Sequence, residues 1–507
     1  IPPLNNVDSS ILLFWLPGSI TSASEISHHI TEFPFFSFLF ADLHPHLMNI
    51  PFAMLVLGLG VNLQAGFKTA GLAWRITASG VLALGLGSLW VINSWDYPTY
   101  VLLVVAFLAL TAYGMSLSPY KQLMLFVGLA LSIIGASWVL FSPFHGSYET
   151  FGTGIEISKW KTPLESYLVI YGLFLFIAVS FLILTVSNQV YEILRKVCRK
   201  KSLLPRELIC FMLLLLGLAI VFYLTVAGYW TASFLITLFT LTGVAIVIEL
   251  TDRPSKNKIQ IIPLVLLGMG LAISIGVDFV HLSGDIGRMN TVFKLYLEVW
   301  LLFGLAISYM GFVVVQKLWH SWRKGRSYKY LAVIWLSTAM FLLGSSLIYP
   351  VLGTIDRVND RFGESSALLD GAGYMVKAEH QEEGAKLDLI WDLEAINWLQ
   401  DTVTGSPVIL EAHDAQYRWN GRVSAYTGLP TLLGWPWHQI QQRNDYQSLI
   451  LQRSEDIKSI YNSEDIKLTL TLLHSYRVSY IYVGELEKAY YSPAGLSKFD
   501  RMVLDGM

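Results

Sequence analysis

Long apolar runs recur through residues 1–350 of the chain. Each run holds about 18 or more residues with almost no charge, which is the length that crosses the hydrocarbon core of a bilayer. The runs predict about ten transmembrane helices. We place them at 46–66, 76–92, 98–115, 122–142, 164–189, 206–227, 229–250, 260–278, 291–316 and 328–349. The chain is therefore expected to be a polytopic α-helical membrane protein that contacts the lipid bilayer.

Basic residues divide the loops between these runs into two sets. One set is rich in Lys and Arg, and it includes the cluster Arg195, Lys196, Arg199, Lys200 and Lys201. The short loops of the opposite set hold only Lys159, Lys161 and Arg288. Because loops rich in Lys and Arg face the cytoplasm, we expect a multi-pass protein of the plasma membrane. Residues before His46, the loops near 93–97, 143–163 and 279–290, and everything after 350 are expected outside.

The composition agrees with this class and excludes others. The chain is 54% hydrophobic and only 14% charged, against roughly 25% charged in soluble proteins. The net charge of −2 gives no indication of a nucleic-acid partner. We find no phosphate-binding Gly-rich loop, no Cys pairs for zinc and no Ser nucleophile elbow, which disfavours an ATP-driven pump.

The pattern changes in the last part of the chain. We interpret 351–387 as a connecting segment and 388–507 as an extracytoplasmic α/β domain, because helical and β-branched stretches alternate there. The expected helices are Leu389–Thr402, 437–453 and 463–475, and the expected strands are Pro407–Glu411 and Val478–Val483.

The first candidate site is Asp42, His44 and His46, just before the first predicted span. Pro45 disfavours a helical conformation at His44, so the segment is expected to be extended, with the three side chains on one face. One carboxylate and two imidazoles bind a divalent metal such as Mg²⁺ or Mn²⁺, or supply an acid and a base. The alternative is a polar helix-entry segment in which Asp42 bonds nearby N–H groups.

The second candidate is Asp96, in the tight turn that begins at Asn93 and ends at Pro98. Asp96 is positioned to face the same cavity as Asp42. Equally, an Asp before a helix that starts with Pro is an ordinary end-cap, with Trp95 and Tyr97 in the aromatic belt of the membrane.

The third candidate leads into a predicted span. Arg288, Thr291, Lys294 and Glu298 have helical spacing and share one face. Arg and Lys at a helix N-terminus suit a phosphate group, and ionisable residues inside a span usually face a cavity or a partner. The alternative is a Lys294–Glu298 pair that joins two helices.

The fourth candidate lies in the last domain. It consists of Glu411 and His413 after a strand, the segment Arg422–Pro430, Gly434-Trp435 and His438. Loops at strand ends commonly carry binding residues. The alternative is a domain core with structural turns.

Several of these segments are specific when taken together. They are Thr31–Phe38, Asp42–His46, Trp95–Tyr100, Arg288–Lys294, Gly421–Pro430 and Tyr480–Gly484. Through them, nearly the whole chain resembles a family of uncharacterised bacterial and archaeal membrane proteins known as Chlor_Arch_YYY or DUF2298. The family's tyrosine triplet belongs to an N-terminal part that this sequence does not contain, so we expect an internal portion of a longer protein. His438-Gln439 also stands where the family resemblance implies His-Glu.

The family in turn looks like a remote relative of the C-type (GT-C) glycosyltransferases. That resemblance implies a multi-spanning enzyme with acidic residues in outer loops and an outer α/β domain. It also implies transfer of a sugar from a polyprenyl-phosphate carrier to a lipid, protein or glycan.

The leading hypothesis is a glycosyltransferase at the outer membrane surface. Asp42 or Asp96 would deprotonate the acceptor or bind a metal, His44 and His46 would assist, and Arg288 with Lys294 would stabilise the departing phosphate. The remaining substrate-binding candidates are Glu32, Trp95, Asn290, Glu411, Arg422, Trp435 and His438. The alternatives are a transporter or flippase of a lipid-linked anionic solute, and a structural or assembly subunit of a membrane complex with partner proteins still unknown.

Overall fold

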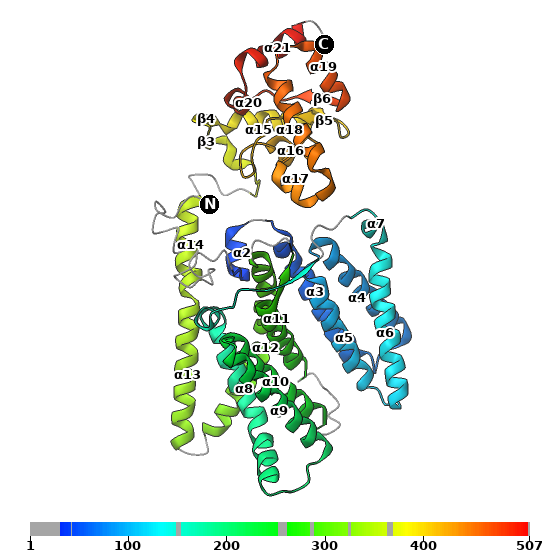
Figure 1. Ribbon diagram of the computed structural model, residues 1–507, viewed down its shortest axis with the longest axis vertical. Helices are drawn as coiled ribbons and strands as arrows, with labels where there is room; N and C mark the ends of the chain where they lie inside the picture. Colours follow the sequence, from blue (N-terminus) through cyan, green and yellow to red (C-terminus); the bar gives the residue numbers. More distant parts are fainter. Residues whose placement is uncertain are drawn as a thin grey trace. The chain divides into compact units, whose positions relative to one another are not determined.

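A computed structural model describes residues 31–41, 43–148, 154–251, 261–283, 288–322, 326–361 and 369–504 (Figure 1). The chain divides into two compact units. The membrane unit comprises 1–148 and 152–361, and the C-terminal unit comprises 149–151 and 362–507.

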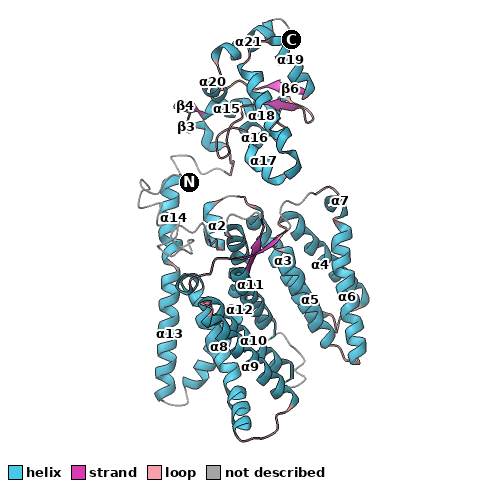
Figure 2. Cartoon of the chain, in the orientation of Figure 1, coloured by secondary structure: helices cyan, strands magenta, loops and turns pink. Residues whose placement is uncertain are grey.

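The membrane unit is built almost entirely from helices (Figure 2). They are α2 (Pro34–Phe40), α3 (Pro45–Gly66), α4 (Leu72–Ile92), α5 (Tyr97–Tyr113), α6 (Pro119–Leu140), α7 (Ser142–His145), α8 (Leu164–Cys198), α9 (Pro205–Val226), α10 (Trp230–Thr251), α11 (Ile261–Phe279), α12 (Met289–Trp322), α13 (Arg326–Ser346) and α14 (Ile348–Arg361). Every predicted span overlaps one of these helices. In the described part of the chain nine helices are long and apolar enough to cross a membrane, the last of them as the stretch Ser327–Arg361. The helix α5 is apolar but shorter, with 17 residues.

Proline fixes where several of these helices begin. Pro45, Pro98, Pro119 and Pro205 each stand in the first turn of a helix. The first N–H groups of a helix have no partner within it, so a Pro there removes no hydrogen bond and presets the backbone angle φ.

Two groups of helices share one apolar core. The helices α3, α4, α5 and α6 pack against one another, and α8 packs with α10, α12 and α13. The helix α11 packs on α10 and α12 and also on α5, so it connects the two groups. Buried residues of α5 and α11, among them Leu103, Phe107, Leu267 and Leu271, belong to the same core.

Two short strands from distant parts of the chain form a small antiparallel sheet in this unit. Strand β1 (Ile155–Ile157) pairs antiparallel with β2 (Val280–Leu282), with Glu156 opposite His281. This pairing brings the segment before α8 to the connection between α11 and α12 (Figure 2).

The C-terminal unit combines helices with two pairs of strands. Its elements are η4 (Gly373–Val376), β3 (Glu379–Glu382), β4 (Ala385–Asp388), α15 (Leu389–Thr402), β5 (Val408–Leu410), α16 (Arg422–Thr427), α17 (Pro436–Gln442), η5 (Asn444–Tyr446), α18 (Gln447–Asn462), α19 (Ile466–Ser475), β6 (Val478–Ile481), α20 (Glu485–Tyr490) and α21 (Pro493–Leu504). Strands β3 and β4 form an antiparallel hairpin, whereas β5 and β6 are parallel. The core gathers around buried Leu410, Ile460 and Tyr461.

The predicted elements of this unit agree with the structure in part. The helix predicted at Leu389–Thr402 is confirmed as α15, and both predicted strands contain an observed one. The single helix predicted at 437–453 is wrong, because the backbone leaves the helical region at Arg443 (φ −144°) and α18 starts afresh after η5. The predicted connecting segment, 351–387, contains most of α14 and the first hairpin strand.

The close packing of α11 against α12 gives a test of the membrane core. A Cβ atom added at Gly270 would meet ring carbons of buried Phe303 at 2.6 and 2.9 Å, whereas one at Gly276 of the same helix would have no neighbour within 4 Å. We expect Gly270→Ala to lower the melting temperature of the protein in detergent, because overpacking costs about 1–3 kcal/mol. Gly276→Ala is the control and should leave it unchanged or raise it. Equal melting temperatures for the two variants would contradict this packing.

Candidate functional site

Asp96 lies at the centre of a buried polar cluster in the membrane unit. Its side chain is 2% exposed. Asn49 of α3 donates a 2.6 Å hydrogen bond to Oδ2, and Asn93 donates another of 2.6 Å to Oδ1. Asp96 occupies the N-cap position of α5, as the end-cap alternative expects, but its side chain accepts no hydrogen bond from the N–H groups of that helix. The carboxyl group instead joins α3 to the turn between α4 and α5.

Glu298 of α12 is the second carboxyl group of this cluster. It is also 2% exposed, and its charge is close enough to Asp96 for the two groups to influence each other. Burial raises the pKa of Asp96 to about 6, although the hydrogen bonds from Asn49 and Asn93 lower it.

Trp95 and Lys294 lie next to this pair along the chain. The Lys294 ammonium nitrogen is 4.5 Å from the ring centroid of Trp95, which is the geometry of a cation–π contact. This contact brings together two predicted substrate-binding residues from the α4–α5 turn and from α12.

His46 and Glu32 form a second pair beside the cluster. The His46 ring nitrogen Nε2 lies 2.8 Å from Oε2 of Glu32, and Ser37 of α2 donates a 2.7 Å hydrogen bond to the same oxygen. Burial opposes ionisation of Glu32, but the contacts with His46 and Ser37 hold the pKa of that carboxyl below its usual range. The His46 ring also packs on Phe293 of α12, at 5.4 Å between centroids.

The predicted face of Asp42, His44 and His46 is only partly tested. His44 is extended, as predicted from Pro45. The extended segment ends there, because α3 begins at Pro45 and His46 is already helical. The two imidazole rings nevertheless lie 4.8 Å apart. Asp42 lies outside the described residues, and among the described ones no three His, Cys, Asp or Glu side chains could together hold a metal ion.

Arg288 lies at the centre of a separate buried polar cluster in the membrane unit, near the strands β1 and β2. Its side chain is 1% exposed. It donates to Asp278 Oδ1 at 2.9 Å, to the Val277 carbonyl at 3.0 Å and to the Thr162 hydroxyl at 3.0 Å. These contacts join the end of α11 and the segment before α8 to the start of α12, where the predicted substrate residue Asn290 lies half-buried. The guanidinium acts here as a positioning group, and its phosphate-binding role stays a prediction.

Arg422 lies at the centre of a buried cluster of charged side chains in the C-terminal unit. Its Nε donates to Asp392 Oδ2 at 2.7 Å, and its Nη2 donates to Glu487 Oε2 at 3.0 Å, with all three side chains nearly inaccessible. Burial opposes the charge, but the two carboxylates raise the pKa of Arg422 well above its usual value. Tyr482 and Trp419 also donate to Asp392, at 2.7 and 2.8 Å.

Glu411 is likewise part of the interior of this unit. It is 1% exposed and accepts from the backbone N–H groups of Val423 and Ser424 at 2.8 and 2.9 Å, at the start of α16. Burial raises the pKa of Glu411 to about 7, although these two hydrogen bonds lower it. The contacts of Glu411 and Arg422 are those of a domain core, the alternative that the sequence left open. Their role in substrate binding stays a prediction.

Trp435 and His438 meet in an aromatic cluster at the surface. Their rings lie 5.3 Å apart, and both pack against Tyr417, which is 73% exposed. Trp435 Nε1 also donates to Asn420 at 3.2 Å. The structure therefore brings these two candidates together and keeps Glu411 and Arg422 inside the unit.

Sequence reasoning missed part of the Asp96 cluster. Asn49 and Tyr100 were not singled out, and Glu298 was assigned to the third candidate site, separately from Asp96. The one available signal for Asn49 was a polar amide within an apolar run.

Comparison with known proteins identifies the membrane unit. The model of the family described as uncharacterized membrane protein (DUF2298) matches residues 8–303, which is more than half of the chain. No curated protein and no solved structure matches.

The buried arginine centre of the C-terminal unit gives the second testable prediction. Arg422→Gln leaves the carboxylates of Asp392 and Glu487 buried without their cation, and breaking such a pair costs about 3–5 kcal/mol. We expect this variant to lower the melting temperature and to expose the C-terminal unit to limited proteolysis. The control is Lys386→Gln, which removes an exposed ion pair with Glu379 and should change little. An Arg422→Gln protein that is as stable as the control would show that the pair does not hold the unit together.

Proposed function

We propose that this chain, which belongs to the DUF2298 family of uncharacterized membrane proteins, is a glycosyltransferase that uses a polyprenyl-phosphate-linked sugar. The observation that carries the proposal is the cluster of Asp96 and Glu298, with Trp95 and Lys294 beside it. It joins an acid–base group, a cation and an aromatic surface at one end of the membrane helices. A transfer at the membrane surface needs these three elements together.

Asp96 is the proposed general base. A base works best when its pKa is near the working pH, and the pKa of Asp96 is raised by burial to about 6. The acceptor hydroxyl oxygen would attack the anomeric carbon of the sugar, and its proton would pass to the Asp96 carboxylate. The bond from that carbon to the phosphate oxygen breaks, and the carrier phosphate leaves with the electron pair.

Lys294 is the proposed partner of the leaving phosphate. Of the two cations expected for this role, we choose Lys294, because its ammonium nitrogen lies 4.5 Å from the ring centroid of Trp95, the residue before Asp96. Its contact with Trp95 fixes the ammonium group beside the turn that carries Asp96. A fixed positive charge at this point stabilises the developing phosphate charge.

His46 and Glu32 are proposed to hold the base in place and to assist proton movement. Their hydrogen bond fixes the ring of His46. If a divalent metal takes part, Asp42, His44 and His46 are the residues that would hold it.

The orientation follows from the basic loops. The turn with Asp96 and the start of α12 fall on the side opposite the Lys- and Arg-rich loops, so we propose that the reaction takes place at the outer face of the plasma membrane. The C-terminal unit falls on the same side in this scheme. Its parallel strands β5 and β6, between helices, support an extracytoplasmic α/β domain that contacts the acceptor.

One observation favours a second function. Buried carboxyl groups such as Asp96 and Glu298 also serve proton-coupled transport in membrane proteins, so a transporter of a lipid-linked anionic solute is the competing proposal. The two functions differ in whether the sugar leaves its carrier.

The experiment uses the full chain in nanodiscs made from its native membrane lipids. Native mass spectrometry first asks whether a polyprenyl phosphate or its sugar adduct is bound, and the loss of the sugar mass is then followed over time. We expect Asp96→Asn to slow the loss of sugar at least about 100-fold while the carrier stays bound. We expect Lys294→Gln to weaken binding of the carrier itself.

The matched control is Glu165→Gln, which removes an exposed carboxylate from the first turn of α8. It should keep both the bound carrier and the transfer rate. Failure to bind any polyprenyl phosphate, or transfer that survives Asp96→Asn, would overturn the proposal. A bound sugar carrier that is moved across the bilayer intact, in a manner dependent on Asp96, would replace it with transport.

A further inference from the structure

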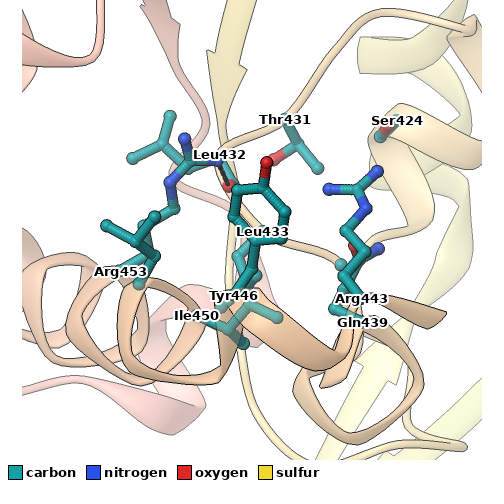
Figure 3. A pocket seen from close by; sticks show the side chains of 11 residues that line it. Ser424, Thr431, Leu432, Leu433, Gln439, Arg443, Tyr446, Ile450 and Arg453 are labelled. Atoms are coloured by element: carbon teal, nitrogen blue, oxygen red, sulfur yellow. Dashed lines mark hydrogen bonds between the residues drawn. The ribbon is translucent and has the colours of Figure 1, made fainter. Parts of the chain in front are cut away.

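A cavity of about 450 Å³ lies in the C-terminal unit, between the start of α16, the segment 431–434 and the helices α17 and α18 (Figure 3). Its volume is within the range of about 300–1,000 Å³ that holds small molecules. Ser424 and Gly434 of the fourth candidate site line it, whereas Glu411, Arg422, Trp435 and His438 do not. The cavity is therefore distinct from both the Asp96 cluster and the buried Arg422 centre.

Two arginines stand on opposite sides of this cavity. Figure 3 shows Arg443 and Arg453 flanking it, with Tyr446 between them. Two contacts fix the side chain of Arg453. It donates to the Leu432 carbonyl at 3.2 Å, and its guanidinium carbon lies 5.6 Å from the ring centroid of Tyr476. Arg443 is exposed, and no side chain among the described residues forms a hydrogen bond or ion pair with it.

The lining of the cavity contains two basic side chains and no acidic one among the described residues. This differs sharply from Arg422, whose charge is balanced by two buried carboxylates. Guanidinium groups bind carboxylate and phosphate oxygens through paired hydrogen bonds, so the cavity suits an oxyanion.

Other residues that line the cavity supply polar groups that can bind ligand hydroxyls, and an apolar surface. The side chains of Thr431 and Gln439 line the cavity and have no hydrogen-bond partner among the described residues. Tyr446, Leu433 and Ile450 supply an apolar floor. Hydrogen-bonding groups opposite an apolar face match the alternating hydroxyl edges and C–H faces of a sugar ring.

We propose that this cavity binds an anionic saccharide, that is, a sugar that carries a phosphate or carboxylate group. The oxyanion lies between Arg443 and Arg453, the hydroxyl groups face Thr431 and Gln439, and the ring rests on Tyr446. The proposal does not depend on glycosyl transfer, since it concerns binding alone.

Isothermal titration calorimetry on the full chain in nanodiscs tests the proposal. The probes are glucose 1-phosphate and glucuronate, and neutral glucose is the comparison. We expect at least one anionic sugar to bind at least tenfold more tightly than glucose, with an affinity that falls as salt is added. Which of the two binds tells whether the oxyanion is a phosphate or a carboxylate.

Arg443→Gln should weaken binding of that sugar at least tenfold, and this exposed residue can be changed without loss of a structural contact. Thr431→Val should weaken it by a smaller factor. The matched control is Arg501→Gln, an exposed arginine of α21 that does not line the cavity, and its affinity should equal that of the wild type. The proposal is overturned if neither anionic sugar binds more tightly than glucose. It is also overturned if the affinity of Arg443→Gln matches that of the control.

Discussion

Asp96 carries a carboxyl group at the point where α3, the α4–α5 turn and α12 approach one another, almost out of contact with solvent. Removing a carboxylate from water costs several kcal/mol unless other groups replace the lost hydrogen bonds. Here the amides of Asn49 and Asn93 supply two. The hydrogen bonds that this one buried carboxyl group requires therefore hold α3 against the α4–α5 turn.

Arg288 and Arg422 have a structural role, whereas Arg443 is placed to bind a ligand. Arg288 and Arg422 are buried, and each is surrounded by acceptors that balance its charge. Breaking either arrangement leaves a carboxylate without a cation, so both residues stabilise the unit that contains them. Arg443 has no such partner among the described residues and lines an open cavity. An exposed guanidinium that has no acidic partner among the described residues is the feature expected of a site for an anion.

The membrane unit and the C-terminal unit differ in how far their sequences predicted their structures. In the membrane unit, lipid requires each span to be apolar along its whole length, so each helix is visible in a local stretch of sequence. In the C-terminal unit the helices are shorter and half-exposed, and local pattern is less decisive. The break at Arg443 interrupts a stretch of residues that otherwise favour a helix, and no Pro or Gly marks it.

The spans, the family and most of the elements of the last unit could be predicted from local patterns of residues. The same patterns singled out Asp96, Lys294 and the His46 segment as chemically unusual. Which of these residues meet became clear only from the packing of the helices. Asn49 and Asp96 are 47 residues apart, and Arg422 and Glu487 are 65 apart. Contacts at such separations arise from helix packing, which no local pattern encodes. The same packing decided that Arg422 lies inside the unit while Arg443 faces a cavity, because the burial of a charge depends on which acceptors the fold brings to it.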